Sequence, residues 1–189
     1  MRQGIGKIIA LIIPLVLVSG AFSTDNAKAY IWTQVNTDGF GDVNNTYIRT
    51  MSVFDNSLYA GTRNVVTGCE VWEYYGNTWW QVNTDGFGNP NNLFAFSMGL
   101  AFGGLGVGTR NPSTGCEAWF YDGSTWTQSI SGGFGDVNNV MVASSALFQG
   151  SPYVGTSNGI TGIEIWWFDG TNWVQVNSDG FGDVNNSDT

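Results

Sequence analysis

The chain contains 189 residues, among them 27 glycines, 9 tryptophans and no histidine, and its formal net charge is −9. An acidic chain repels phosphate backbones, so we do not expect nucleic acid as a partner. Without histidine there are no Ser-His or Cys-His nucleophile pairs and few ways to build a zinc site, so we expect a protein that is not an enzyme.

Residues 1–29 have the pattern of a secretory signal peptide. Basic residues near the start are followed by an apolar run at residues 8–18 and by a small-x-small cleavage signal at residues 27–29. Such a segment is removed on export, so the mature protein is expected to begin near Tyr30, to be extracellular or on the cell surface, and not to be in the membrane. A retained anchor is the alternative, which Pro14 and the short apolar run argue against.

The remainder of the chain, residues 30–189, repeats with a period of 47 residues and no insertion or deletion. A fixed period of this size is typical of repeat architectures, in which stacked units bury a shared core. Three sets of positions define the period: Gly39, Gly86, Gly133 and Gly180; Trp32, Trp79, Trp126 and Trp173; and Glu70, Glu117 and Glu164.

The first repeat contains four short segments rich in strand-forming residues, with turn residues such as Asn56-Ser57 and Gly76-Asn77 between them. Short turns join neighbouring antiparallel strands, and the glycine content argues against helices. We therefore predict a four-stranded antiparallel meander in each repeat. In the first repeat the predicted strands are residues 47–54, 58–62, 69–75 and 79–83.

A meander of this length, with glycine in the inner strands and tryptophan in the last, is typical of a β-propeller blade. We predict an all-β fold in which three complete blades form a partial or fragmentary propeller. Closed propellers have about 4–8 blades, so further blades or self-association would be needed to close the ring. The predicted segments are blades at residues 46–83, 93–130 and 140–177, an orphan strand at 30–36 and a terminal loop at 178–189.

The aromatic–turn–Trp segments at residues 71–79 (VWEYYGNTW) and 119–126 (WFYDGSTW) resemble the third and fourth strands of kelch-type propeller repeats. The paired glycine of kelch repeats is missing, and residues 58–62 take its place. The resemblance implies a propeller that serves as a binding scaffold. Kelch-type propellers also include the enzyme galactose oxidase, but its copper site requires histidine, which this chain lacks.

The loop at residues 35–45 (VNTDGFGDVNN) recurs at 82–92 and 176–186 and is similar to the calcium loops of FG-GAP, integrin-type propellers. That family has Asp at the opening position, where Gln34 stands here. The resemblance implies calcium as the only candidate cofactor, held by carboxylate, amide and carbonyl oxygens. Besides the Phe40 carbonyl, the implied ligands are Asn36, Asp38, Asp42, Asn83, Asp85, Asn89, Asn177, Asp179 and Asp183.

The same loop is also explained as a structural turn. Asp-Gly and Asn-Asn pairs supply side-chain-to-backbone hydrogen bonds and positive φ angles, and the phenylalanine would anchor the loop between blades. The third copy keeps Gly133-Phe134-Gly135 but has Ile130 and Gly132 in place of the first two ligands. The third copy thus retains the turn without the carboxylate found at Asp38 in the first copy, which favours the structural interpretation.

Arg63 and Glu70 flank a turn, and symmetric pairing of the strands predicts a cross-strand ion pair, repeated at positions 110 and 117. In the third copy the arginine is Ser157, so Glu164 is expected to be solvated, with ligand contact as the alternative. Cys69 and Cys116 occupy equivalent positions and are expected to be buried apolar residues rather than a disulfide. A disulfide remains the alternative in an oxidising compartment.

These features predict a secreted or cell-surface, non-enzymatic binding scaffold whose ligand is a glycan or a protein bound at the loop-bearing rim. Residues 30–189 carry 3 basic and 14 acidic residues, a net charge of −11. A calcium-stabilised adhesion-type propeller is one alternative. Another is a secreted hydrolase that uses two carboxylates from the set Glu70, Glu117 and Glu164, although equivalent positions seldom give an acid and a base different environments.

Overall fold

The computed structural model describes residues 32–187, so the predicted signal peptide at residues 1–29 lies outside the described residues. The chain divides before Gln34, and the fold described below is that of the second unit, residues 34–189. Among the described residues, no helix has the length and apolar character needed to cross a membrane.

The second unit is all-β, as predicted, and contains three antiparallel meanders of four strands each. In the first repeat the strands match the predicted ones to within two residues at each end. Four short 3₁₀ turns mark the Gly-Phe-Gly loops: η1 (Asp38–Gly41), η2 (Asp85–Gly88), η3 (Gly132–Gly135) and η4 (Asp179–Gly182). The strands are β1 (Tyr47–Phe54), β2 (Ser57–Arg63), β3 (Val71–Tyr75), β4 (Thr78–Gln81), β5 (Phe94–Ala101), β6 (Gly104–Arg110), β7 (Ala118–Tyr121), β8 (Trp126–Ile130), β9 (Met141–Phe148), β10 (Ser151–Ser157), β11 (Ile165–Phe168) and β12 (Trp173–Gln175).

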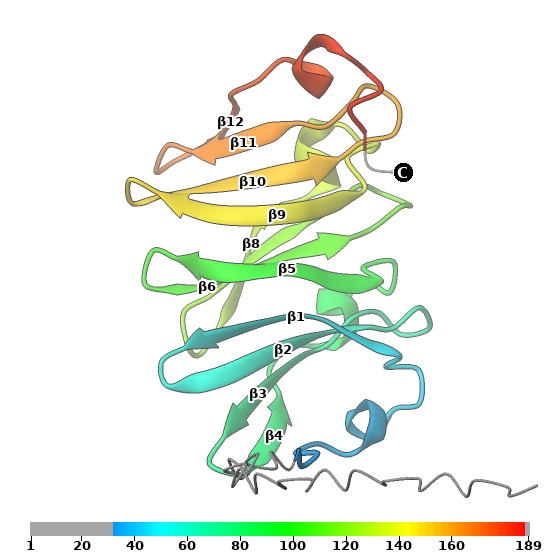
Figure 1. Ribbon diagram of the computed structural model, residues 1–189, viewed down its shortest axis with the longest axis vertical. Coiled ribbons are helices and arrows are strands. Elements are labelled where there is room, and N and C mark those ends of the chain that lie inside the picture. The colour runs from blue at the N-terminus through cyan, green and yellow to red at the C-terminus, as the bar shows by residue number, and fades with distance from the viewer. Residues whose placement is uncertain (1–31, 188–189) are drawn as a thin grey trace, which may run out of the picture. The chain divides into compact units, whose positions relative to one another are not determined.

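Neighbouring repeats are joined through their first two strands. Arg63 of β2 pairs with Phe94 of β5, and Arg110 of β6 pairs with Met141 of β9, so all twelve strands belong to one sheet. Figure 1 shows the hairpins β1–β2, β5–β6 and β9–β10 following one another, with β3 and β4 beyond the first hairpin and β11 and β12 beyond the last. Among the described strands, the path ends at β4 and β12 without closing.

Close approach of the inner strands explains the glycine that recurs at positions 61, 108 and 155. A Cβ atom on Gly108 would lie 2.4 Å from the Cβ of Val142, which belongs to the next repeat. At Gly61 the corresponding distance to the Cβ of Ala95 would be 2.7 Å. Only a residue without a side chain allows this packing, which accounts for the recurrence of glycine at these positions.

The orphan strand predicted for residues 30–36 is not found over its described part, because residues 32–36 have no strand structure. A strand of the β4 type pairs with a β3-type strand, as Trp72 pairs with Gln81. Residues 32–36 have no such neighbour within the described part of the chain. One carbonyl of this segment instead contacts the repeat that follows, because the Trp79 indole N–H donates a hydrogen bond to the Val35 carbonyl at 3.0 Å.

The main core lies between the first and second repeats and includes Tyr59, Val71, Leu105 and Tyr121. A smaller cluster around Val142 lies between the second and third repeats. Both cysteines are free and fully buried, which confirms that they act as small apolar residues. Burial raises the pKa of Cys116 to about 12 and raises that of Cys69 further, so neither thiol is a nucleophile at neutral pH.

Candidate functional site

Three of the four Gly-Phe-Gly loops insert their phenylalanine, Phe40, Phe87 or Phe134, between two tryptophans. In the second loop, Phe87 stacks on Trp119 with ring centroids 4.8 Å apart and meets Trp126 edge-on at 5.0 Å. Phe87 has φ +57°, a left-handed conformation that costs a side-chain-bearing residue roughly 1–2 kcal/mol. Two aromatic contacts offset that cost, since each contributes about 0.5–1.5 kcal/mol beyond area burial. The predicted anchoring of the loop by phenylalanine is confirmed.

The same loop joins the first repeat to the second by hydrogen bonds. On the first repeat, the Cys69 N–H donates to the Asn92 carbonyl at 2.7 Å, and the Gly86 N–H donates to the Cys69 carbonyl at 2.8 Å. On the second repeat, the Asn92 side chain donates to Glu117 at 2.8 Å and accepts from Asn111 at 3.0 Å. The loop is therefore a connector whose polar side chains are satisfied within the protein.

The predicted ion pairs of Arg63 with Glu70 and of Arg110 with Glu117 are wrong. The backbone N–H of Thr62 donates to the Glu70 carbonyl at 2.9 Å, so Glu70 lies opposite Thr62. Arg63 is therefore one residue away from the position that an ion pair with Glu70 would need. A shift of one residue places two strand side chains on opposite faces. Arg63 instead lies 5.3 Å from the ring centre of Phe94.

The three repeat-equivalent glutamates are buried hydrogen-bond acceptors. Glu164 is 5% exposed and accepts from Asn139 at 2.6 Å and from the Trp166 indole at 2.8 Å, so the expected solvation of this side chain is wrong. Glu70 accepts the equivalent pair of bonds, and burial raises its pKa while those bonds oppose the rise. Carboxylates buried and occupied in this way are poorly suited to general acid–base chemistry on a solvent-borne substrate.

The carboxylates implied as calcium ligands accept hydrogen bonds from separate partners. Asp38, Asp85 and Asp179 each accept from the glutamine four residues earlier, at 2.7–2.8 Å. Asp42 accepts from the Asn44 and Asn64 amides. The glutamine at the opening position of each of these loops therefore presents an N–H group, not its carbonyl oxygen, to the aspartate.

The amides and the remaining carboxylate of the set are engaged in the same way. The Oδ1 atoms of Asn83 and Asn177 each accept a backbone N–H at 2.6 Å. Asn36 donates to the Thr37 carbonyl, Asn89 donates to Glu117, and Asp183 accepts from Asn185. Within residues 32–187, no group of three or more acidic or cysteine side chains is placed to hold a metal. The side chains as arranged do not fit a calcium site, and calcium binding stays a prediction.

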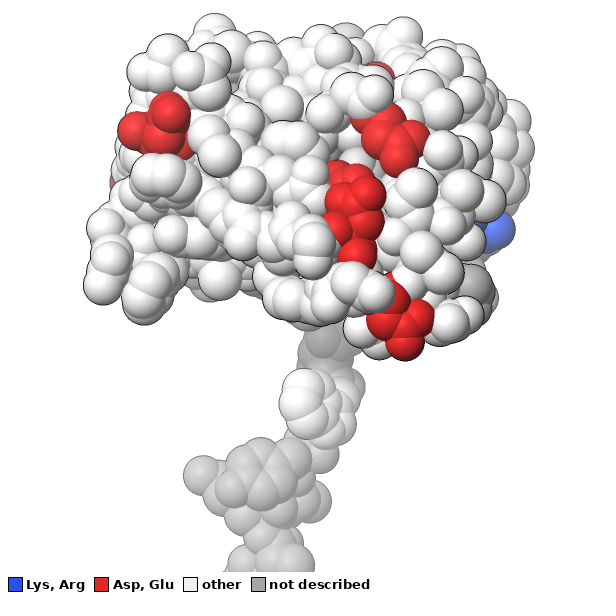
Figure 2. All heavy atoms as spheres, turned by 90° about the horizontal axis from the view of Figure 1, so that it is seen from above, with Lys and Arg blue, Asp and Glu red and all other residues white. Residues whose placement is uncertain are grey.

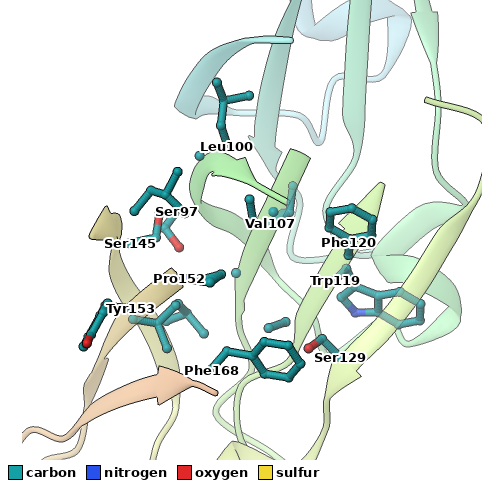
Figure 3. Close-up of a pocket in the computed structure, with 18 of the residues that line it drawn as sticks. Ser97, Leu100, Val107, Trp119, Phe120, Ser129, Ser145, Pro152, Tyr153 and Phe168 are labelled. Atoms are coloured by element: carbon teal, nitrogen blue, oxygen red, sulfur yellow. The ribbon is translucent and has the colours of Figure 1, made fainter. Parts of the chain in front are cut away.

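A cavity of about 620 Å³ lies between the second and third repeats. It is lined by β5, β6, β7 and β8 of the second repeat and by β9, β10, β11 and β12 of the third (Figure 3). Aromatic rings form much of its wall, and none of the lining residues is charged. The aromatic lining residues are Phe102, Trp119, Phe120, Tyr153, Phe168 and Trp173.

Departures from the 47-residue repeat explain why this interface is hollow and the preceding one is filled. Between the first and second repeats, large side chains fill the space, and Tyr59 meets Tyr121 at 6.1 Å. One period later each of four such side chains is replaced by a smaller residue. The replacements are Phe54 by Ala101, Tyr59 by Gly106, Val82 by Ser129 and Met98 by Ser145. Sequence reasoning missed this site, although comparing the copies position by position would have revealed it.

Free hydroxyl groups lie at one side of the cavity. Figure 3 shows Ser97 and Ser145 together, opposite Trp119 and Phe120. Within the described part of the chain, no hydrogen bond is formed by the hydroxyl of Ser97, which is 8% exposed, or by that of Ser145. Ser129 accepts from the Trp173 indole at 2.9 Å and keeps its own O–H to donate. Hydroxyls that have no partner within the protein are available to form hydrogen bonds with a ligand.

The charged side chains lie away from the pocket, because none of them lines it. Figure 2 shows acidic side chains as separate patches among uncharged residues on the face viewed from above. The pocket itself therefore presents an uncharged, low-polarity environment inside an acidic protein.

No protein-family model matches the sequence, and no curated protein matches it. The kelch and FG-GAP resemblances are therefore not confirmed. Among solved structures, a fucose lectin from Kordia zhangzhouensis in complex with methyl-fucoside is similar, with a TM-score of 0.39 and 10% identity over 67% of this chain and 95% of that one. A likeness this remote transfers neither ligand nor residue roles to the present chain.

Proposed function

We propose that the protein is a non-enzymatic binding scaffold whose ligand enters the pocket between the second and third repeats. The observation that carries the proposal is the loss of four large side chains at this interface and at no other interface between described repeats. A cavity opened in a core costs stability, about 24 cal/mol per Å³ in a well-studied series. A role in ligand binding readily explains why so large a cavity is retained in a regular repeat.

The size and lining of the pocket also support a binding role. Ligand sites are typically concave spaces of about 300–1,000 Å³, mainly apolar, with a few well-placed polar groups. The pocket meets each of these criteria. The candidate ligands are an uncharged glycan that stacks an apolar ring face on the aromatic wall, a protein side chain, and a small apolar molecule.

Secretion and a propeller-type arrangement belong to the same proposal. The pattern of residues 1–29 supports export, and the meanders and their fixed period support blades arranged about an axis. Further repeats or a second copy would then close the ring. The buried state of Glu70, Glu117 and Glu164 makes the hydrolase alternative less favourable.

A filling substitution tests the binding site. Gly106→Tyr restores the tyrosine of the first interface, and a Cβ at this position would meet its nearest atom at 3.5 Å, an ordinary contact. Gly159→Tyr is the matched control, because its Cβ would have nothing within 4 Å. The full chain and both variants would be screened against neutral glycans and neutral aromatic compounds. Binding that Gly106→Tyr abolishes and Gly159→Tyr preserves is expected, whereas binding insensitive to Gly106→Tyr, or cleavage of a bound glycan, contradicts the proposal.

A further inference from the structure

The pocket has too few polar groups to satisfy a free sugar. Among the described lining residues, its free side-chain hydroxyls come from Ser97, Ser145, Thr127 and Tyr153, and Ser129 can donate one further bond. A hydroxyl buried without a partner costs roughly 1–3 kcal/mol in proteins. Because a monosaccharide carries several hydroxyls around its ring, full burial in this pocket would leave some of them unpaired.

Charged ligands are disfavoured for a related reason. No Lys, Arg, Asp or Glu lines the pocket, so a bound carboxylate or ammonium group would lose its hydration without meeting a counter-charge. The three arginines among the described residues lie along the inner strands and contact aromatic rings there, as Arg49 does with Phe96 at 4.2 Å. Strong discrimination between an uncharged group and its charged analogue is therefore expected.

Ser97 and Ser145 lie across the cavity from two of the aromatic residues, Trp119 and Phe120, which favours one orientation of a ligand. Phe168 lies below these residues in the view of Figure 3. Phe102 extends from the β5–β6 turn to meet Phe168 edge-on at 5.5 Å, which joins the two repeats at one end of the pocket. A ring system would stack on the aromatic side and direct a hydroxyl toward the serines.

We infer that the pocket binds an uncharged, largely apolar small molecule that contains a ring and carries one or two hydroxyl groups, which the Ser97 and Ser145 hydroxyls recognise. This inference rests on the proposed function and narrows its ligand class. A glycan would enter only as the polar end of such a molecule.

A matched series of probes tests the inference by calorimetry on the full chain. 2-Naphthaleneethanol, 2-naphthaleneacetate and 2-naphthaleneethylamine share one ring system and differ in the polar group, and methyl glucoside represents the free sugar. The alcohol is expected to bind at least about tenfold more tightly than either charged analogue, with no binding of methyl glucoside at millimolar concentration. The variant Ser97→Ala/Ser145→Ala is expected to weaken the alcohol about two- to tenfold, the range for loss of a neutral hydrogen bond.

Failure of this inference can be told apart from failure of the proposed function. Three results would each overturn the inference but leave the proposed binding function standing. They are equal binding of the charged analogues, no effect of the double serine substitution, and binding of methyl glucoside alone that Gly106→Tyr removes. The proposed function is overturned as well if no ligand, from this series or from the wider screen of neutral glycans and aromatic compounds, shows binding that Gly106→Tyr removes. Such binding would have to be kept by wild type and by Gly159→Tyr.

Discussion

The Asn92 side chain donates a hydrogen bond to the Glu117 carboxylate at 2.8 Å, and both side chains are buried. The contact joins a loop to the turn between β6 and β7, and it recurs one period earlier and one period later. The equivalent distances are 2.7 Å for Asn45 to Glu70 and 2.6 Å for Asn139 to Glu164. The glutamates that looked like catalytic candidates in the sequence are thus part of the polar framework that holds the repeats together.

Substitution of Glu117 by glutamine is expected to destabilise the fold. Its carboxylate accepts bonds from Asn89, Asn92 and the Trp119 indole, and an amide would turn an N–H group toward one of these donors. A buried donor left without an acceptor costs about 1–3 kcal/mol. Urea unfolding would measure the loss, with the exposed turn variant Asp55→Asn as the control, expected to change stability by less than about 0.5 kcal/mol. An unchanged midpoint for Glu117→Gln would show that the contact contributes nothing.

The β7–β8 turn is expected to lose stability in acid. Four hydrogen bonds from Thr125 and Ser124 lower the pKa of the exposed Asp122 from 3.8 to about 2. Because the folded-state pKa is depressed, this contribution is present above pH 3.8 and is lost as the pH falls toward 2. Melting temperatures measured across this window should fall less steeply for Asp122→Asn than for wild type. Parallel curves would exclude a role for the ionised turn.

Gly108→Ala is expected to destabilise the chain by about 1–3 kcal/mol, as overpacking of a core does. The new Cβ would lie 2.4 Å from Val142 and 2.6 Å from the Ser97 hydroxyl oxygen. Gly159→Ala is the matched control, since a Cβ there meets nothing within 4 Å. Chemical denaturation of both variants compares the same substitution in a crowded and in an open position. Equal stabilities would mean that the inner strands can move apart without cost.

The fold class could be predicted from the sequence because the period repeats every constraint three times. Strand alternation, turn residues and the glycine at positions 61, 108 and 155 all agree, and the strands of the first repeat lie within two residues of their predicted bounds. The partners of the acidic residues could not be predicted in this way. Whether Glu70 faces Arg63 or Asn45 depends on a one-residue shift in register, which composition and spacing do not fix.

The pocket was missed for a different physical reason. Sequence periodicity emphasises what the repeats share, whereas a cavity depends on where the copies differ. Gly106 and Ala101 are unremarkable strand residues in isolation, and only the tyrosine and phenylalanine that occupy the same positions one period earlier identify them as missing volume. The free hydroxyls of Ser97 and Ser145 become informative only once the cavity is known.

Two phenylalanines at equivalent positions are expected to respond differently to truncation. Phe54 packs on the core between the first two repeats, whereas Phe148, two periods later, is 58% exposed. Phe54→Ala should therefore cost up to about 3–5 kcal/mol, the usual range for a buried phenylalanine, and Phe148→Ala less than about 1 kcal/mol. Thermal unfolding of the two variants gives the comparison. A large loss for Phe148→Ala would mean that another surface covers this residue in solution.

Calcium is expected to leave the melting temperature unchanged. The ion takes about six to eight oxygen ligands, yet the Asp42 carboxylate accepts from Asn44 and Asn64, and the Asn83 side-chain oxygen accepts the Val71 N–H. Coordination would have to break these bonds, and the connection between repeats depends on them. Thermal unfolding with millimolar calcium, with magnesium and with a chelator distinguishes the two interpretations of the loop. A rise specific to calcium that Asp42→Asn removes would establish a metal site, because loss of one ligand charge weakens coordination while the neutral amide oxygen can still accept the Asn64 hydrogen bond.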